Sequence, residues 1–426
     1  MRRLNADGHR VSCASPGDCQ AAVTAAGFPY VQLTPNTYSE WSRVDKNVPW
    51  VRRLMDTSNR RRKAIEALGV ERVAAELTEM QPDLVLIDRE LHEHIIIALS
   101  LDLPLALTST WFAIWRKPRI PPPHKGIIPG QTWKGSRAGI ELYWRWLHLH
   151  KTRLAFREGV RHPGADRISV LKALANLHGV KLRKHIELYQ WQIPFSYKSL
   201  PLLCLRSLEM EFPHKPPRTV HYMGPMINPQ RVDQSTSTDS NAQLESILSR
   251  HRRDGNRVLI YCGFGSFFKT IEAFLYRLFE AAASRPDWDL IVPVGEDQMR
   301  KLGELSAENV HCFDWVPQLQ VLGQADLALV HGGVNTIAEC VHFGVPMIVY
   351  NQEFLDMPGN TARVVYHGIG VEGDIRGETP EEIRAKIDGI LENAEIKTRV
   401  TTMRDRVLNS DRDKRVEDVV HELLAE

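Results

Sequence analysis

The strongest constraint on the fold comes from residues 329–351, which read LVHGGVNTIAECVHFGVPMIVYN. A short apolar run ends in His-Gly-Gly, a stretch with helical spacing follows, and a second apolar run closes the segment. The two apolar runs of this segment belong to 326–330 and 345–350, which are short, continuous and rich in branched residues. Two runs of the same kind, 257–262 and 289–294, precede the segment. Such runs are typical of strands buried on both faces of a parallel sheet. The second half of the chain therefore predicts an α/β, doubly wound domain.

The first half of the chain carries fewer runs of this kind. They lie at 9–14, 29–33, 83–88 and 103–109, and a long stretch without clear strand alternation follows them. Between the halves, residues 228–243 are polar and poor in aliphatic side chains, which is typical of a linker. The length of 426 residues also favours at least two domains.

Composition excludes several classes of protein. Lys and Arg total 54 against 52 Asp and Glu, and the net charge of +2 gives no argument for nucleic acid as a partner. The six cysteines are scattered without a Cys-x-x-Cys pair, which suits a reducing compartment. No stretch approaches the roughly 20 apolar residues of a membrane span. We therefore expect a cytoplasmic protein.

The His-Gly-Gly sequence suits an anion. A parallel strand that ends in glycines and leads into a helix brings backbone N–H groups and the positive end of the helix dipole to the carboxyl edge of the sheet. His331, Asn335 and Thr336 can add side-chain donors, and Glu339, one helical turn deeper, can accept from a pair of ribose hydroxyls. The plainer alternative is a strand-to-helix turn without a ligand.

Further motifs accompany this turn on both sides. Upstream, Trp315 offers a flat face for a base and Gln318 offers an amide for its edge, with Pro317 fixing the backbone between them. Downstream, Asp356 follows the next predicted strand, at the same edge of the sheet. The motifs span nearly fifty residues, and a chance match of all of them to one family signature is not a serious alternative.

In this order and spacing the motifs resemble the C-terminal signature of the UDP-glycosyltransferase superfamily, the family-one glycosyltransferases of GT-B fold. The matched positions are Trp315, Val316, Pro317, Gln318, His331, Gly333, Asn335, Thr336, Glu339, Gly344, Val345, Pro346, Asp356 and Asn360. The resemblance implies an α/β protein in which two Rossmann-like, doubly wound parallel-sheet domains face a cleft. It implies a nucleotide-sugar donor and a small-molecule acceptor, with no metal and no further cofactor.

The resemblance also implies a role for each donor-site residue. Trp315 would stack on uracil with Gln318 beside it, and Glu339 would hold the ribose. The pyrophosphate would lie against Gly333 and be held by three side chains, His331, Asn335 and Thr336. The sequence YCGFGSF resembles the family's Ser-Phe-Gly-Ser loop, whose positions facing the phosphates or sugar correspond here to Gly263, Gly265 and Ser266.

The sugar end of the site departs from the family pattern. Asp356 would hydrogen-bond sugar hydroxyls, but Met357 stands where the family usually has glutamine. A thioether can neither donate nor accept a strong hydrogen bond. Either Gln352 or a backbone group substitutes for the missing amide, or the sugar preference is altered.

The first half resembles the family's acceptor domain only in part. The run 83–88 resembles the strand that carries the family's catalytic Asp, which maps to Asp88. The alternative for Asp88 is a helix N-cap without chemistry. His9 does not match the family's catalytic His, and His92 and His94 have helical spacing and are expected to be solvated or packed.

The family's first strand and its catalytic-His loop have no counterpart in this sequence. Because the first strand of a doubly wound sheet is usually central, its loss would leave unpaired backbone groups on both neighbours. We therefore expect the native protein to start upstream of Met1 by roughly twenty to thirty residues. The alternative is a pseudoenzyme that binds a nucleotide sugar without transferring it.

The segment 111–160 contains five tryptophans and ten Lys or Arg against two Asp or Glu. Such a stretch is typical either of a helical pair with a tryptophan core or of a peripheral membrane contact. In the family, the corresponding region shapes the acceptor pocket.

The resemblance implies inverting transfer of a hexose from a UDP-sugar to a hydroxyl of a small, apolar acceptor. A sugar-nucleotide epimerase on the same fold is a less favoured alternative. We expect an acceptor-binding domain over 1–227, the linker over 228–243, a nucleotide-sugar domain over 244–402, and a C-terminal helix over 403–426 that packs back on the N-terminal half.

Overall fold

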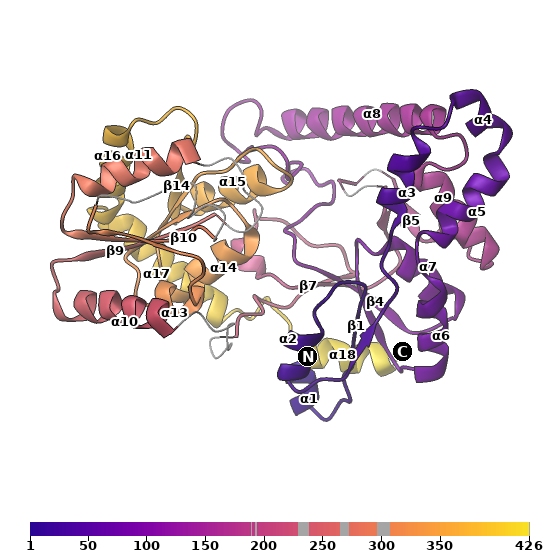
Figure 1. Ribbon diagram of the computed structural model, residues 1–426, viewed down its shortest axis with the longest axis horizontal. Coiled ribbons are helices and arrows are strands. Elements are labelled where there is room, and N and C mark those ends of the chain that lie inside the picture. The colour runs from indigo at the N-terminus through magenta and orange to yellow at the C-terminus, as the bar shows by residue number, and fades with distance from the viewer. Residues whose placement is uncertain (189, 192–193, 229–237, 265–271, 296–306, 426) are drawn as a thin grey trace.

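A computed structural model of the chain describes residues 1–188, 190–191, 194–228, 238–264, 272–295 and 307–425. Two α/β domains lie side by side, and the end of the chain returns from the second domain so that the last helix lies against the first (Figure 1). Among the described residues, no helix is both long enough and apolar enough to span a membrane.

The C-terminal domain is built on a six-stranded, wholly parallel sheet. In spatial order its strands are β11 (Val310–Phe313), β10 (Trp288–Pro293), β9 (Val258–Gly263), β12 (Leu327–Val330), β13 (Met347–Val349) and β14 (Gly370–Glu372). Its helices are α10 (Thr238–Arg253), α11 (Glu272–Ala283), α13 (Gln318–Leu322), α14 (Val334–Phe343), α15 (Met357–His367), α16 (Pro380–Leu391) and α17 (Ala394–Leu408). Helices cover both faces of the sheet, with α11 and α16 on one face and α10, α14 and α17 on the other. The predicted doubly wound domain is confirmed.

The N-terminal domain contains a four-stranded parallel sheet in the order β3 (Val85–Asp88), β4 (Leu105–Ser109), β7 (Leu202–Cys204) and β8 (Val220–Tyr222). Two strands pair separately and in parallel, β1 (Cys13–Ser15) and β2 (Tyr30–Gln32), and two form a small antiparallel ladder, β5 (Ile186–Glu187) and β6 (Ser196–Tyr197). Its helices are α1 (Arg2–Ala6), α2 (Gln20–Ala25), α3 (Tyr38–Asp45), α4 (Trp50–Met55), α5 (Thr57–Glu66), α6 (Glu71–Met80), α7 (His92–Ser100), α8 (Arg137–Arg161) and α9 (Arg167–Leu177), with 3₁₀ turns at Leu182–Lys184 and Leu208–Met210.

All eight predicted strands form, whereas four strands of the two main sheets were not predicted. These are β7, β8, β11 and β14, which are three or four residues long. A run this short carries too few residues for a periodic pattern, and pairing with neighbours decides its conformation. The predicted capping box of α16 is present: Thr379 accepts from the backbone of Glu382, whose carboxylate accepts from the backbone of Thr379.

Three predicted boundaries or elements differ from the structure. Helix α10 begins at Thr238, inside the predicted linker, because its apolar residues bury against the sheet; residues 229–237 lie outside the described part of the chain. The predicted helix over 403–426 is two helices, α17 and α18 (Val416–Ala425), and only α18 packs on the N-terminal sheet. The segment 111–160 forms one long helix, α8, preceded by an irregular stretch, instead of a helical pair.

A buried ion pair joins the two domains. Arg363 on α15 donates from Nε (2.9 Å) and Nη2 (2.7 Å) to one carboxylate oxygen of Glu211, and both side chains are at most 2% exposed. The guanidinium also lies between the rings of Phe112 and Phe212, with centroid distances of 4.7 and 4.6 Å. The other carboxylate oxygen of Glu211 accepts from the Tyr222 hydroxyl at 3.2 Å. The start of α15 is therefore fixed relative to the N-terminal domain.

We expect Glu211→Gln to lower the free energy of unfolding by about 3–5 kcal/mol, because it leaves a buried guanidinium without its counter-charge. Urea denaturation followed by tryptophan fluorescence measures the change. The control is Glu395→Gln, which breaks an exposed ion pair with Arg399 one helical turn away and should cost less than about 0.5 kcal/mol. Equal effects of the two substitutions would contradict the proposed role of the buried pair.

Candidate functional site

The turn between β12 and α14 requires both of its glycines. Gly332 has φ of +90°, which favours glycine, and a Cβ there would lie 3.2 Å from Val349. A Cβ at Gly333 would lie 2.3 Å from His331 Nε2, so only glycine lets the imidazole lie over the turn. Gly333 is also the N-cap residue of α14, whose first backbone N–H groups therefore open at this edge of the sheet.

His331 connects this turn to the neighbouring strand. Its Nδ1 lies 3.2 Å from the carbonyl oxygen of Gly263 at the end of β9. Because a carbonyl can only accept, Nδ1 carries the proton, and in the neutral ring Nε2 is then an acceptor. Burial lowers the pKa of His331, and the Gly263 contact and the charge of Asp356 offset part of that decrease. Donation from Nε2 to an anion therefore requires the ring to take up a proton.

The structure brings together three residues that are distant in sequence. The Tyr261 hydroxyl donates to Gln318 Oε1 at 2.8 Å, and Gln318 Nε2 donates to the carboxylate of Glu339. Gln318 opens α13 and Glu339 lies on the buried side of α14. Trp315, three residues before Gln318, is partly buried. Gln318 and Glu339 thus lie side by side, as expected of residues that share one ligand.

The start of α15 contacts the same turn. Asn360 Nδ2 donates to the carbonyl of Gly332 at 2.9 Å and to the carboxylate of Asp356 at 3.0 Å. A Cβ on Gly332 would lie 3.4 Å from the Cβ of Met357, which places Met357 directly against the turn. Burial raises the pKa of Asp356, and the Asn360 hydrogen bond and the positive charges of Arg363 and Arg206 partly offset the rise.

Arg206 reaches the site from the N-terminal domain and was not predicted from the sequence. Its Nε donates to the backbone carbonyl of Thr110 at 2.7 Å, and its Nη2 donates to Asn335 Oδ1 at the start of α14. Burial lowers the pKa of Arg206 to about 10, while the nearby carboxylates of Asp356 and Glu339 raise it. The side chain stays charged at neutral pH. The one signal in the sequence is an arginine that directly follows the apolar run of β7.

Asp88 ends β3 at the carboxyl edge of the N-terminal sheet and is exposed. Its carboxylate accepts from the backbone N–H of Glu90 at 2.9 Å, so it caps a turn ahead of α7. The pKa of Glu90 is raised, first by loss of solvent and then by the negative charges of Asp88 and Asp356. Carboxylates from both domains therefore lie close enough to influence one another.

Within the described residues, no histidine is hydrogen-bonded to Asp88. His9 lies beside Asp7 and His421, against the terminal helix. His92 and His94 are buried, and the ring of His92 packs on Phe195 with 4.8 Å between centroids. Of the predicted phosphate loop, Gly263 is described, whereas Gly265 and Ser266 lie outside the described residues.

Parts of this chain are similar in sequence to known proteins. The model of the erythromycin biosynthesis protein CIII-like C-terminal domain matches residues 277–424. Zeaxanthin glucosyltransferase of Pantoea ananas is 27% identical over 200 residues, which cover 45% of this chain and 42% of the relative. Oleandomycin glycosyltransferase of Streptomyces antibioticus is 27% identical over 217 residues, covering 49% and 50%. The matches thus span half or less of these relatives.

Solved structures resemble the whole chain. The glycosyltransferase of kitacinnamycin superposes with a TM-score of 0.62 at 23% identity, covering 99% of this chain and 93% of that one. The calicheamicin glycosyltransferase CalG4 superposes with a TM-score of 0.63 at 18% identity, covering 99% and 92%. These likenesses show the fold, which is GT-B. The fold and the C-terminal domain match are those that the predicted resemblance to the family-one glycosyltransferases implies.

We expect Asp356→Asn to stabilise the folded chain at neutral pH and to have less effect in acid. A raised carboxyl pKa means that the folded state binds the proton more tightly than the unfolded state. Stability then falls as pH rises from the unfolded-state pKa to the folded-state pKa. Above the folded-state pKa the full cost of burying the charged carboxylate remains. Asn removes that cost and can keep the contact with Asn360.

Thermal unfolding at about pH 3.5 and about pH 7.5 measures this effect, because the lower pH lies below the unfolded-state pKa of about 3.9. The stabilisation should be larger at the higher pH, and the control Asp411→Asn, at an exposed position, should change neither midpoint. Destabilisation by Asp356→Asn at the higher pH would show that the buried carboxylate carries no such cost.

Proposed function

We propose that the chain transfers a hexose from a UDP-sugar to a hydroxyl of a small, apolar acceptor with inversion at the anomeric carbon. The acceptor oxygen attacks that carbon, the bond to the diphosphate oxygen breaks, and the hydroxyl proton passes to a base. Asp88 is the proposed catalytic carboxylate. UDP leaves as an anion, and the N-terminus of α14 together with the Arg206 guanidinium supplies positive potential for it.

A single observation carries the proposal: hydrogen bonds reach the β12–α14 turn and α14 itself from four different parts of the chain. They come from the end of β9 through Gly263, from α13 through Gln318, from α15 through Asn360 and from the N-terminal domain through Arg206. In this set, the helix N–H groups and the arginine suit a diphosphate. The carboxylate suits the two hydroxyls of a ribose diol. A turn without a ligand would not need a buried arginine from the other domain.

The proposed roles follow the position of each side chain. Trp315 and Gln318 take the base, Glu339 takes the ribose diol, and His331, Asn335 and Thr336 take the diphosphate. Asp356 and Met357 face the sugar, for which the sequence predicts a hexose without naming which one. Two structural relatives were solved with thymidine diphosphate, VinC and the spinosyn rhamnosyltransferase SpnG, so dTDP is the alternative nucleotide that has to be tested.

The second candidate is nucleotide-sugar binding without transfer. The observation that favours it is that Asp88 has no histidine hydrogen-bonded to it among the described residues. In that case the chain would bind UDP but would release none from UDP-glucose in the presence of a panel of small apolar alcohols and phenols. Acceptor-dependent release of UDP would exclude this candidate.

We expect UDP to raise the thermal midpoint of the chain, with GDP having no effect and dTDP a smaller one. A ligand present at one hundred times its Kd adds about 2.7 kcal/mol of stability. Glu339→Gln should weaken UDP binding about tenfold or more, because it removes a charged acceptor worth about 1.5–3 kcal/mol. Its effect on dTDP should be smaller, since deoxyribose lacks one hydroxyl of the diol.

The matched control is Glu395→Gln on the exposed side of α17, which should leave every nucleotide shift unchanged. A shift with none of the three nucleotides would overturn the proposed donor site. Equal loss of UDP and dTDP binding in Glu339→Gln would show that Glu339 does not read the diol.

We also propose peripheral membrane contact through α8. Five large apolar side chains recur every three to seven residues on its solvent side and are 49–73% exposed: Leu142, Trp146, Leu149, Phe156 and Val160. Exposed arginines lie among them at positions 145, 153 and 157. Apolar side chains flanked by basic ones suit an anionic lipid surface, from which an apolar acceptor could also be drawn.

We expect the chain to co-sediment with liposomes that contain anionic lipid, and less so with neutral ones or at high salt. Trp146→Ser with Phe156→Ser should lower the bound fraction several-fold, because it removes two of the largest exposed rings. Leu177→Ser, at a 71% exposed position at the end of α9, is the control and should bind like wild type. No co-sedimentation at low salt would end the membrane proposal.

A further inference from the structure

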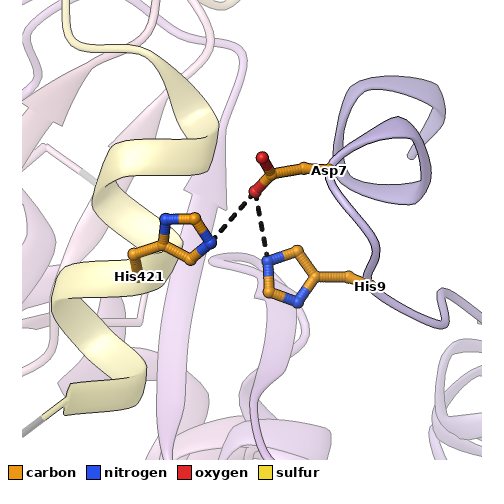
Figure 2. A group of neighbouring side chains, drawn as sticks. All are labelled: Asp7, His9 and His421. Carbon is orange, nitrogen blue, oxygen red and sulfur yellow. Dashed lines mark ion pairs between the residues drawn. The ribbon is translucent and has the colours of Figure 1, made fainter.

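Asp7, His9 and His421 bring three metal-binding side chains together where the N-terminal segment meets the last helix (Figure 2). Asp7 follows α1, His9 lies two residues further on, and His421 projects from α18. The Nε2 atoms of His421 and His9 lie 3.0 and 3.4 Å from the same carboxylate oxygen of Asp7. The potential ligand atoms all lie within 4.8 Å of one another.

These separations suit a small divalent cation. Ligands about 2.0 Å from a tetrahedral ion lie about 3.3 Å apart, which matches the two nitrogen–oxygen separations. Two imidazoles and one carboxylate form a donor set preferred by zinc and its borderline neighbours, whereas calcium and magnesium prefer oxygen ligands alone. Three protein ligands leave the fourth tetrahedral position for water.

One of the three donors lacks a hydrogen-bond partner. His9 Nε2 is shielded from solvent and, among the described residues, accepts or donates no hydrogen bond, although it faces the Asp7 carboxylate. A shielded nitrogen without a partner is costly, and a metal ion at the centre of the group would satisfy it. The side chain of His421 is 57% exposed, so an ion can reach the group from solvent.

The surroundings hold the two segments in place without using these three residues. Arg3 donates to both carboxylate oxygens of Glu417 at 2.8 and 2.7 Å, and Leu4 packs against Val416, Val419 and Val420. The backbone that carries the donors is therefore positioned before any ion binds. Arg3 is engaged with Glu417 and does not compete for Asp7.

We propose that Asp7, His9 and His421 bind one divalent cation of the zinc class, which fastens the N-terminal segment to α18. The ion is structural and lies on the outer side of the N-terminal domain, away from α14. Because α18 is the element that returns from the second domain to the first, the ion stabilises the chain's own cross-domain connection. The proposal does not depend on the proposed transferase activity.

The test uses the 426-residue chain, free of affinity tag and stripped with chelator, titrated with Zn²⁺ by calorimetry and with Co²⁺ by absorption spectroscopy. We expect one equivalent of Zn²⁺ to bind and to raise the thermal midpoint. Co²⁺ should give the visible bands of a low-coordinate site without the charge-transfer band of a thiolate ligand. A thiolate band would place the metal on a cysteine and overturn the proposal.

The variants His421→Gln and Asp7→Asn should each lower Zn²⁺ affinity at least about tenfold, since even second-shell changes cost that much. Both side chains reach solvent, so the variants should fold, and their thermal midpoints without metal provide the check. The control is His178→Gln at the end of α9, which should bind like wild type. No zinc binding by wild type, or equal binding by all variants, would overturn the proposal.

Discussion

The buried pair between Glu211 and Arg363 is the contact on which the site depends. It fixes α15 against the N-terminal domain, and α15 carries Asp356, Met357 and Asn360 at its start. A guanidinium enclosed by two phenylalanine rings and a carboxylate has few alternative arrangements, because any movement would expose an unpaired charge to an apolar interior. Arg206 adds a second contact between the domains, at the start of α14.

The charges around the start of α14 are balanced across the domain junction. Asp356 and Glu339 come from the C-terminal domain, and Arg206 comes from the other, where burial lowers its pKa to about 10. Each charged group here is partly stripped of water, which costs stability that hydrogen bonds and neighbouring opposite charges partly offset. Carboxylates whose pKa is shifted by burial are common where ligands bind.

Much of the donor side could be predicted from the sequence, because its residues follow strands whose carboxyl ends must meet at one sheet edge. Gln318 and Glu339 are an example: each was predicted from its own motif, and the structure joins them by a hydrogen bond. Arg206 could not be predicted in the same way. It follows a strand of three residues in the other domain, and its partner Asn335 is 129 positions away.

The sequence by itself determined the doubly wound C-terminal domain, the glycine turn and the order of the donor-site motifs. These depend on local rules: the burial of short strands, the φ values that only glycine tolerates, and the dipole at a helix start. Only the tertiary structure decided how the domains dock, which carboxylates face Arg206, and that His9 meets His421. Those contacts join residues far apart in the chain, and packing and charge pairing in the folded state select them.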